Sequence, residues 1–92
     1  MMHARRIQLL GEIRDGHDGL AGIPRAKQHD AMAKLIEWQR LAERLDIILQ
    51  TSYEVTRRGL ELRFAAATLT PSGRRVLEDG ERRTTGGATR ER

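Results

Sequence analysis

The sequence predicts a small α+β domain, and three observations support this prediction. Apolar residues recur with the period of an α-helix in two separate segments of the first half. From Ile47 onward the pattern changes to the two-residue alternation of β-strands. The chain has only 92 residues, so it has room for one hydrophobic core and not for two.

The first element is an amphipathic helix. Its apolar stripe contains Ile7, Leu10 and Ile13. The run Asp-Gly-His-Asp-Gly follows, and its first glycine, Gly16, is expected to end the helix. Residues 20–23 then form a short apolar patch, for which we expect a strand of two or three residues.

A longer helix follows, with Asp30 as the expected N-cap and a start as early as Pro24 also possible. Its apolar seam has the 4-3-4-3 spacing of a heptad and consists of Ala31, Leu35, Trp38, Ala42 and Leu45. One interpretation makes this seam the core that packs on the first helix. The other makes it the interface of a homodimer. If the seam is core, the residues beside it would face a second chain; these are Met32, Ile36 and Leu41.

A β-hairpin is expected after the long helix. Residues 47–56 and 60–66 both alternate between apolar and polar side chains, and Thr-Arg-Arg-Gly at 56–59 supplies a turn with two arginines at its tip. Thr70 is then a good N-cap and Pro71 suits the first position of a helix. We expect that helix to be short and to end at Gly80, so that residues 1–79 form the domain.

The last thirteen residues, 80–92, are expected to be a disordered basic tail. They contain four Arg and two Glu and no apolar side chain larger than Ala. The full chain carries a formal net charge of +4. This excess permits an anionic partner.

Two segments resemble parts of a winged helix, the helix-turn-helix variant with a β-hairpin wing. Leu-Ala-Glu-Arg-Leu-Asp-Ile-Ile, at 41–48, is similar to the end of a recognition helix that runs into a strand, with Asp46 in place of the usual Gly. Leu-Thr-Pro-Ser-Gly-Arg-Arg-Val-Leu-Glu, at 69–78, resembles the segment after the wing. The resemblance covers residues 3–79 and extends to small bacterial and phage proteins. Only about thirteen residues separate Gly16 from Asp30, so the positioning helix is expected to be missing or fused with the long helix.

The resemblance implies DNA binding by a transcriptional regulator or a phage-type accessory protein. In this family the start of the recognition helix reaches base edges and the wing touches phosphates. The residues at those places in this chain are Arg25, Lys27, Gln28, His29, Lys34, Arg57, Arg58 and Arg63. Among them, Gln28 is expected to pair with adenine and Arg25 with guanine.

Two other interpretations stay open. The same basic side chains are typical of a solvated surface that keeps a small protein in solution. A winged helix can also present its long helix or its hairpin to a partner protein, so a protein-interaction module is the alternative function.

Composition argues against several other classes of protein. The chain has no Cys, which excludes disulfides, thiol nucleophiles and cysteine-based metal sites. His3, His17 and His29 are too far apart in sequence for a compact ligand pair, so no metal or cofactor is expected. No motif of a nucleophile or a phosphate loop is present, so an enzyme is not expected. No apolar segment approaches the roughly 20 residues that span a bilayer, and no secretory signal is visible, so we expect a cytoplasmic protein without a membrane partner.

Overall fold

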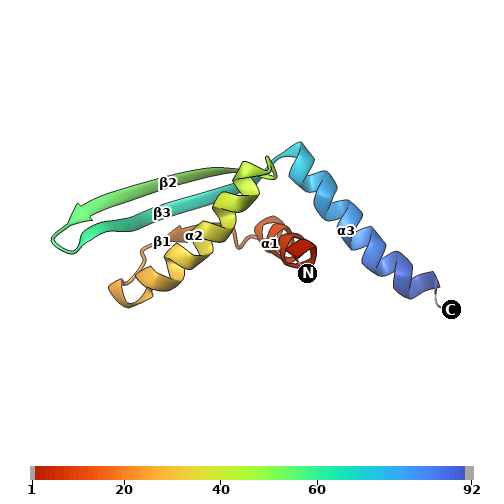
Figure 1. The fold of residues 1–92 in the computed structure, drawn as a ribbon, viewed down its shortest axis with the longest axis horizontal. Helices are drawn as coiled ribbons and strands as arrows, with labels where there is room; N and C mark the ends of the chain where they lie inside the picture. The colour runs from red at the N-terminus through yellow and green to blue at the C-terminus, as the bar shows by residue number, and fades with distance from the viewer. Residues whose placement is uncertain (1, 91–92) are drawn as a thin grey trace.

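The computed structural model describes the backbone of residues 2–90 and the side chains of residues 4–83. It confirms the predicted α+β class, with helices and one antiparallel sheet (Figure 1). The elements in chain order are α1 (Met2–Arg14), β1 (Gly19–Ala21), the 3-10 helix η1 (Arg25–Lys27), α2 (Gln28–Glu43), β2 (Ile47–Thr56), β3 (Gly59–Leu69) and α3 (Pro71–Arg90).

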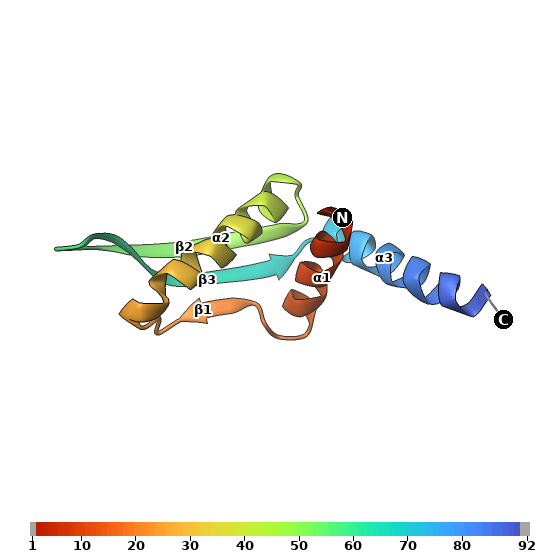
Figure 2. The same ribbon diagram turned by 60° about the horizontal axis from the view of Figure 1, so that its bottom comes forward.

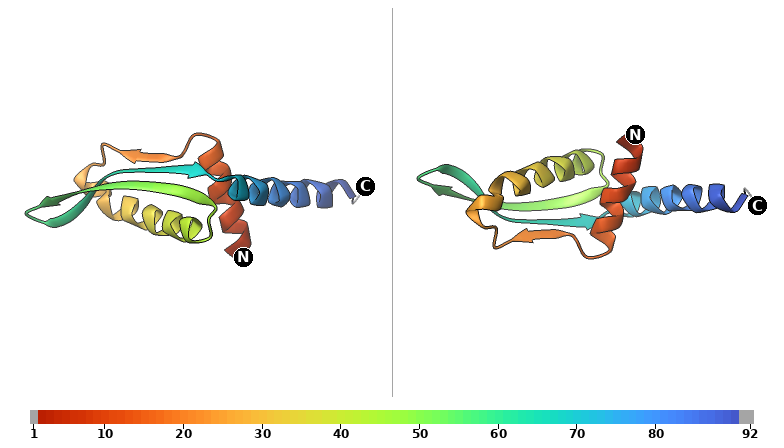
Figure 3. Two further views of the ribbon diagram at one scale, coloured as in Figure 1. Left: turned by 90° about the horizontal axis from the view of Figure 1, so that it is seen from above. Right: turned by 90° about the horizontal axis from the view of Figure 1, so that it is seen from below.

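The sheet has the strand order β1-β3-β2. β2 and β3 form the predicted hairpin, from the pair Ile47–Leu69 to the pair Thr56–Gly59. The register shifts by one residue after Ser52, and β1 pairs with the middle of β3. Figure 2 shows α2 crossing one face of this sheet, while the tip of the hairpin extends beyond the helix. The hairpin and α3 point to opposite ends of an elongated molecule (Figure 3), whose extents are 59 × 24 × 21 Å.

The core forms where α1, α2 and the sheet meet. Leu10 and Leu35 are fully buried there, and Trp38 is 2% exposed. The interpretation of the α2 seam as intramolecular core is therefore confirmed for Ala31, Leu35 and Trp38. The expectation that Leu41 faces a second chain is wrong, because this side chain is 3% exposed and belongs to the same core. Such a buried tryptophan in a small domain contributes several kcal/mol, about 3–5 by large-to-small substitution.

The expected N-cap Asp30 is wrong, because Lys27 is the N-cap of α2 and Asp30 lies in its first turn. The earlier start near Pro24 is closer to the structure, since η1 has Pro24 as its N-cap and runs directly into α2. The Gln28 amide Nε2 donates to the carbonyl of Leu62 at 2.8 Å, while its Oε1 accepts from the Leu62 N–H at 3.0 Å. This side chain thus fastens the first turn of α2 to β3. The space for a separate positioning helix holds only the single turn of η1.

The end of α2 also differs from the prediction. The Asp46 N–H donates to the Leu41 carbonyl at 2.9 Å, and the Leu45 N–H donates to the Ala42 carbonyl at 3.0 Å. These two bonds form a Schellman motif, which requires a left-handed residue just after the helix. That residue is Leu45, with φ of 65°, and not Asp46, which we aligned with the usual glycine. Leu45 is consequently 71% exposed and does not belong to the core seam.

Asp46, the residue after Leu45, links the turn between α2 and β2 to α1 and to the start of α3. Its carboxylate is 1% exposed and accepts two hydrogen bonds from Arg6 of α1, at 2.8 and 2.9 Å. Its carbonyl accepts from the Thr70 N–H at 3.0 Å. The Thr70 hydroxyl in turn accepts from the Gly73 N–H at 2.9 Å, which confirms Thr70 as the N-cap of α3.

The prediction that Gly80 ends the last helix is wrong, because α3 continues to Arg90. Gly80 is buried where α3 crosses α1, and a Cβ atom there would collide with the side chain of Ile7. The glycine therefore permits close helix contact and does not terminate the helix. Arg14 of α1 and Glu81 of α3 reinforce the crossing with an ion pair at 2.7 Å. The backbone of the expected tail is thus helical as far as Arg90, and residues 91–92 lie outside the described part of the chain.

Candidate nucleic-acid interface

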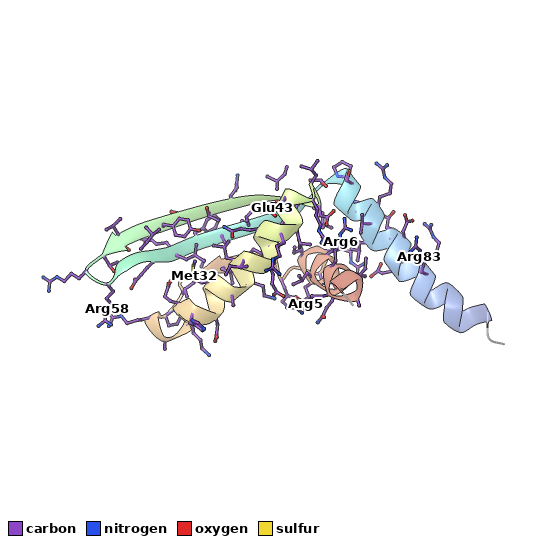
Figure 4. The ribbon with its side chains drawn as sticks, in the orientation of Figure 1. Arg5, Arg6, Met32, Glu43, Arg58 and Arg83 are labelled. Carbon is purple, nitrogen blue, oxygen red and sulfur yellow. The ribbon has the colours of Figure 1, made fainter. Side chains whose placement is uncertain are left out.

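The tip of the hairpin is a short, well-defined turn that carries two arginines. The Thr56 hydroxyl accepts from the Arg58 N–H and donates to the Gly59 carbonyl, both at 3.1 Å. Gly59 has φ of 110°, a conformation that suits glycine. The Arg57 and Arg58 side chains are exposed, and neither makes a hydrogen bond or an ion pair with another described residue. Figure 4 labels Arg58 at this end of the molecule.

The start of α2 lies at the same end as the hairpin tip (Figures 2 and 3). Pro24 begins the turn, and its carbonyl accepts from the Lys27 N–H at 2.8 Å. The side chains of Arg25, Lys27 and His29 are exposed here. In the part of the chain whose side chains are described, none of the three makes a hydrogen bond or an ion pair.

Five of the eight predicted side chains are therefore brought together at one end. They are Arg25, Lys27, His29, Arg57 and Arg58. We call this set the basic end. Asp30, Glu54 and Glu61 are the carboxylates close to it in sequence, and Glu54 and Glu61 are opposite each other in the hairpin. Exposed guanidinium and ammonium groups without partners are suited to charge-assisted hydrogen bonds with phosphate oxygens.

The other three predicted residues are engaged elsewhere. Both ends of the Gln28 amide bond the backbone of Leu62, so its predicted pairing with adenine would require these bonds to break. Lys34 lies on the flank of α2 that faces α1 and pairs with Glu12 at 3.3 Å. Arg63 pairs across the hairpin with Glu54 at 3.2 Å. The Arg63–Glu54 pair is exposed and therefore weak, so Arg63 remains available at small cost, whereas the Lys34–Glu12 pair is half-buried.

A second basic cluster was missed by the sequence analysis. Arg5 donates two hydrogen bonds to Glu37, at 2.7 and 2.8 Å, across the α1–α2 interface. This hydrogen bonding lowers the pKa of Glu37 and raises the pKa of Arg5. Arg40 and Arg44 line the same small cavity. The only sequence signals were the adjacent Arg5 and Arg6 and the one-turn spacing of the other two arginines.

Other kinds of site have little support in the described residues. These residues contain no group of three or more His, Asp or Glu side chains arranged to hold a metal ion. None of the helices in this part of the chain has the length and apolar character needed to cross a bilayer. No protein-family model, curated protein or solved structure matches this chain.

Proposed function

We propose that this protein binds double-stranded DNA, as a small transcriptional regulator or a phage-type accessory protein. The start of α2 approaches the major groove, and the hairpin tip contacts the phosphate backbone. The observation that carries this proposal is the basic end, where exposed side chains from α2, η1 and the hairpin make no hydrogen bond or ion pair with the side chains of residues 4–83. The order of elements is also the one on which the resemblance to a winged helix rests.

The positions of the cations favour contacts of two kinds. Arg57 and Arg58 extend from the tip of a two-stranded ribbon, where phosphate or minor-groove contact is geometrically simplest. Arg25 and Lys27 precede α2 and would enter a groove with the first turn of the helix. Because Gln28 is occupied, direct reading of bases would use Arg25 or Lys27, both of which can pair with guanine.

The test is a comparison of two double variants that each remove two positive charges. Arg57→Ala with Arg58→Ala should weaken binding to a 25 bp duplex of random sequence. The matched control is Arg82→Ala with Arg83→Ala, on α3 away from the basic end, where Figure 4 labels Arg83. This control should keep an affinity close to that of the native chain. Equal loss in both variants would indicate a response to net charge and would contradict binding through the basic end.

A second candidate, a protein-interaction module, is favoured by one observation. Apolar side chains are exposed on the outer half of the hairpin, with Tyr53 38%, Leu60 65% and Val55 81% exposed. Val55 and Leu60 are opposite each other in the hairpin. Exposed apolar clusters of this kind often mark contacts with another protein.

Replacing this apolar pair separates the two candidates. Val55→Ser with Leu60→Ser should leave DNA affinity nearly unchanged if the basic end binds DNA. If the protein is instead an interaction module, the native chain should bind no duplex at 50 mM salt. In that case the Ser variant should no longer bind the partner protein that the native chain captures in a pull-down.

A further inference from the structure

A small cavity lies between α1 and the C-terminal half of α2, away from the basic end. Its volume is about 90 Å³. Four arginines and one glutamate line it: Arg5 and Arg6 from α1, Glu37 and Arg40 from α2, and Arg44 at the C-cap of α2. Figure 4 labels Arg5 and Arg6 on α1, far from Arg58. The convergence of four guanidinium groups on one cavity is the feature that requires an explanation.

Two of these guanidinium groups are held rigidly by carboxylates. Arg5 uses Nε and Nη2 to bond Glu37, and Arg6 uses Nε and Nη2 to bond Asp46. A guanidinium has five N–H groups, so this side-on pairing leaves the Nη1 hydrogens of both residues without an acceptor among the described residues. The carboxylates therefore orient the two guanidinium groups but use only some of their N–H donors. Such preorganised donors lose little conformational entropy when they bind an anion.

The other two guanidinium groups have no carboxylate of their own. Arg40 lies on α2 and Arg44 is the C-cap of that helix; both are exposed, and neither side chain makes a hydrogen bond or an ion pair with another described residue. Glu37, which is hydrogen-bonded to Arg5, also lies near Arg40, and Glu12 lies near Arg5. Hydrogen bonding to Arg5 lowers the pKa of Glu37, so this carboxylate is ionised at neutral pH. The cavity still has more arginines than hydrogen-bonded carboxylates, and this excess of positive charge favours an anion.

The floor and size of the cavity define the ligand further. The two leucines at the floor, Leu9 and Leu41, are 4% and 3% exposed. An apolar floor weakens the screening of charges by water and strengthens their attraction for an anion. The cavity volume of about 90 Å³ is well below the roughly 300 Å³ of a pocket for an organic ligand, so its enclosed part suits a compact group.

We propose that this cavity binds one phosphate group in its dianionic form. Arg40 and Arg44 supply the uncompensated charge, and the free edges of Arg5 and Arg6 supply oriented donors. The same chemistry is available from free inorganic phosphate and from a phosphate monoester at the end of a larger molecule. This site does not depend on the DNA-binding proposal, because it shares no residue with the basic end.

The test is a titration of the full-length protein with inorganic phosphate at pH 7.5 and constant ionic strength, followed by NMR of the arginine Nε–H groups. The resonances of Arg5, Arg6, Arg40 and Arg44 should shift and saturate, and phosphate should raise the melting temperature. Sodium chloride at equal ionic strength should reproduce neither effect. The absence of saturation by about 20 mM phosphate, or equal shifts with chloride, would overturn the proposal.

Variants locate the site and distinguish the two sources. Arg40→Ala with Arg44→Ala should weaken phosphate binding at least about tenfold, while Arg82→Ala with Arg83→Ala should not. Arg40→Lys with Arg44→Lys should bind phosphate more tightly than the alanine pair does but more weakly than the native chain. Lysine keeps the positive charge but lacks the planar set of N–H donors of a guanidinium. Equal weakening by the two alanine pairs would refute the site. Tighter binding of phenyl phosphate than of inorganic phosphate would identify a phosphate monoester as the ligand, and equal binding would identify the free ion.

Discussion

The backbone carbonyl of Asp46 occupies the space that any side chain at position 73 would need. A Cβ atom on Gly73 would overlap with that carbonyl oxygen. The contact brings the first turn of α3 directly against the turn between α2 and β2. Since Asp46 also binds Arg6 of α1, this single point fixes three helices relative to one another.

Gly73→Ala should therefore destabilise the protein by about 2 kcal/mol or more, because backbone atoms must move to admit the new methyl group. Urea unfolding followed by circular dichroism measures the change. The matched control is Gly11→Ala in α1, where a Cβ atom would make only an ordinary contact, 3.8 Å from Leu77 Cδ1. That control should gain about 0.5–1 kcal/mol from helix propensity. Equal effects at the two glycines would contradict the close approach at position 73.

Leu45→Gly should stabilise the protein by about 1 kcal/mol. Leu45 has φ of 65° and its side chain is largely exposed, so glycine removes backbone strain and loses little packing. Leu45→Ala keeps the strain and should change the free energy of unfolding by less than about 0.5 kcal/mol. Thermal and urea unfolding of both variants test this. A destabilised glycine variant would show that the exposed leucine contributes contacts that outweigh the strain.

Gln28→Ala should lower stability by about 1–3 kcal/mol. The substitution removes both partners of the Leu62 backbone and leaves partly buried polar groups without hydrogen bonds. Gln39→Ala, on the exposed face of the same helix, is the control and should change stability by less than about 0.5 kcal/mol. If the two variants are equally stable, Gln28 does not fasten α2 to β3, and its assignment as a base-reading side chain becomes tenable again.

The ion pair of Arg5 with Glu37 predicts a pH dependence. Hydrogen bonding to Arg5 lowers the pKa of Glu37 in the folded state. The pair therefore stabilises the fold above the ordinary glutamate pKa of about 4.3, and this contribution is lost as pH falls through the lower folded value. Between pH 5 and 3, Glu37→Gln should lose less stability than the native chain. Glu43→Gln, on the same helix without an ion pair, should follow the native profile. Identical profiles for both variants would contradict the assignment.

The sequence predicted the elements well and the contacts between distant residues less well. The change of apolar period at Ile47 gave the strands, and Thr70 with Pro71 gave the start of α3. The end of α3 was missed because Gly80 was interpreted from local rules, whereas its role depends on Ile7, 73 residues away. The role of Asp46 likewise could not be predicted, because its carboxylate is bonded by Arg6, a residue distant in sequence.

The candidate site was only partly predictable for the same reason. Hairpin geometry places Arg57 and Arg58 at an exposed tip whatever the rest of the fold does. The engagement of Gln28 with Leu62 depends on a tertiary contact that no local pattern encodes. The spacing of Arg40 and Arg44 is also typical of a solvated helix face. Only the position of α1 beside α2 makes them part of a cavity.

The most direct test of DNA binding is fluorescence anisotropy with a labelled 25 bp duplex, at about 50 and 200 mM salt. The native chain should bind at the lower salt and lose affinity by about a hundredfold or more at the higher salt, as several phosphate contacts require. Arg57→Ala with Arg58→Ala should bind more weakly, with a salt slope smaller by about 1 to 2. The absence of binding at 50 mM salt by a chain that circular dichroism shows to be folded would contradict the account.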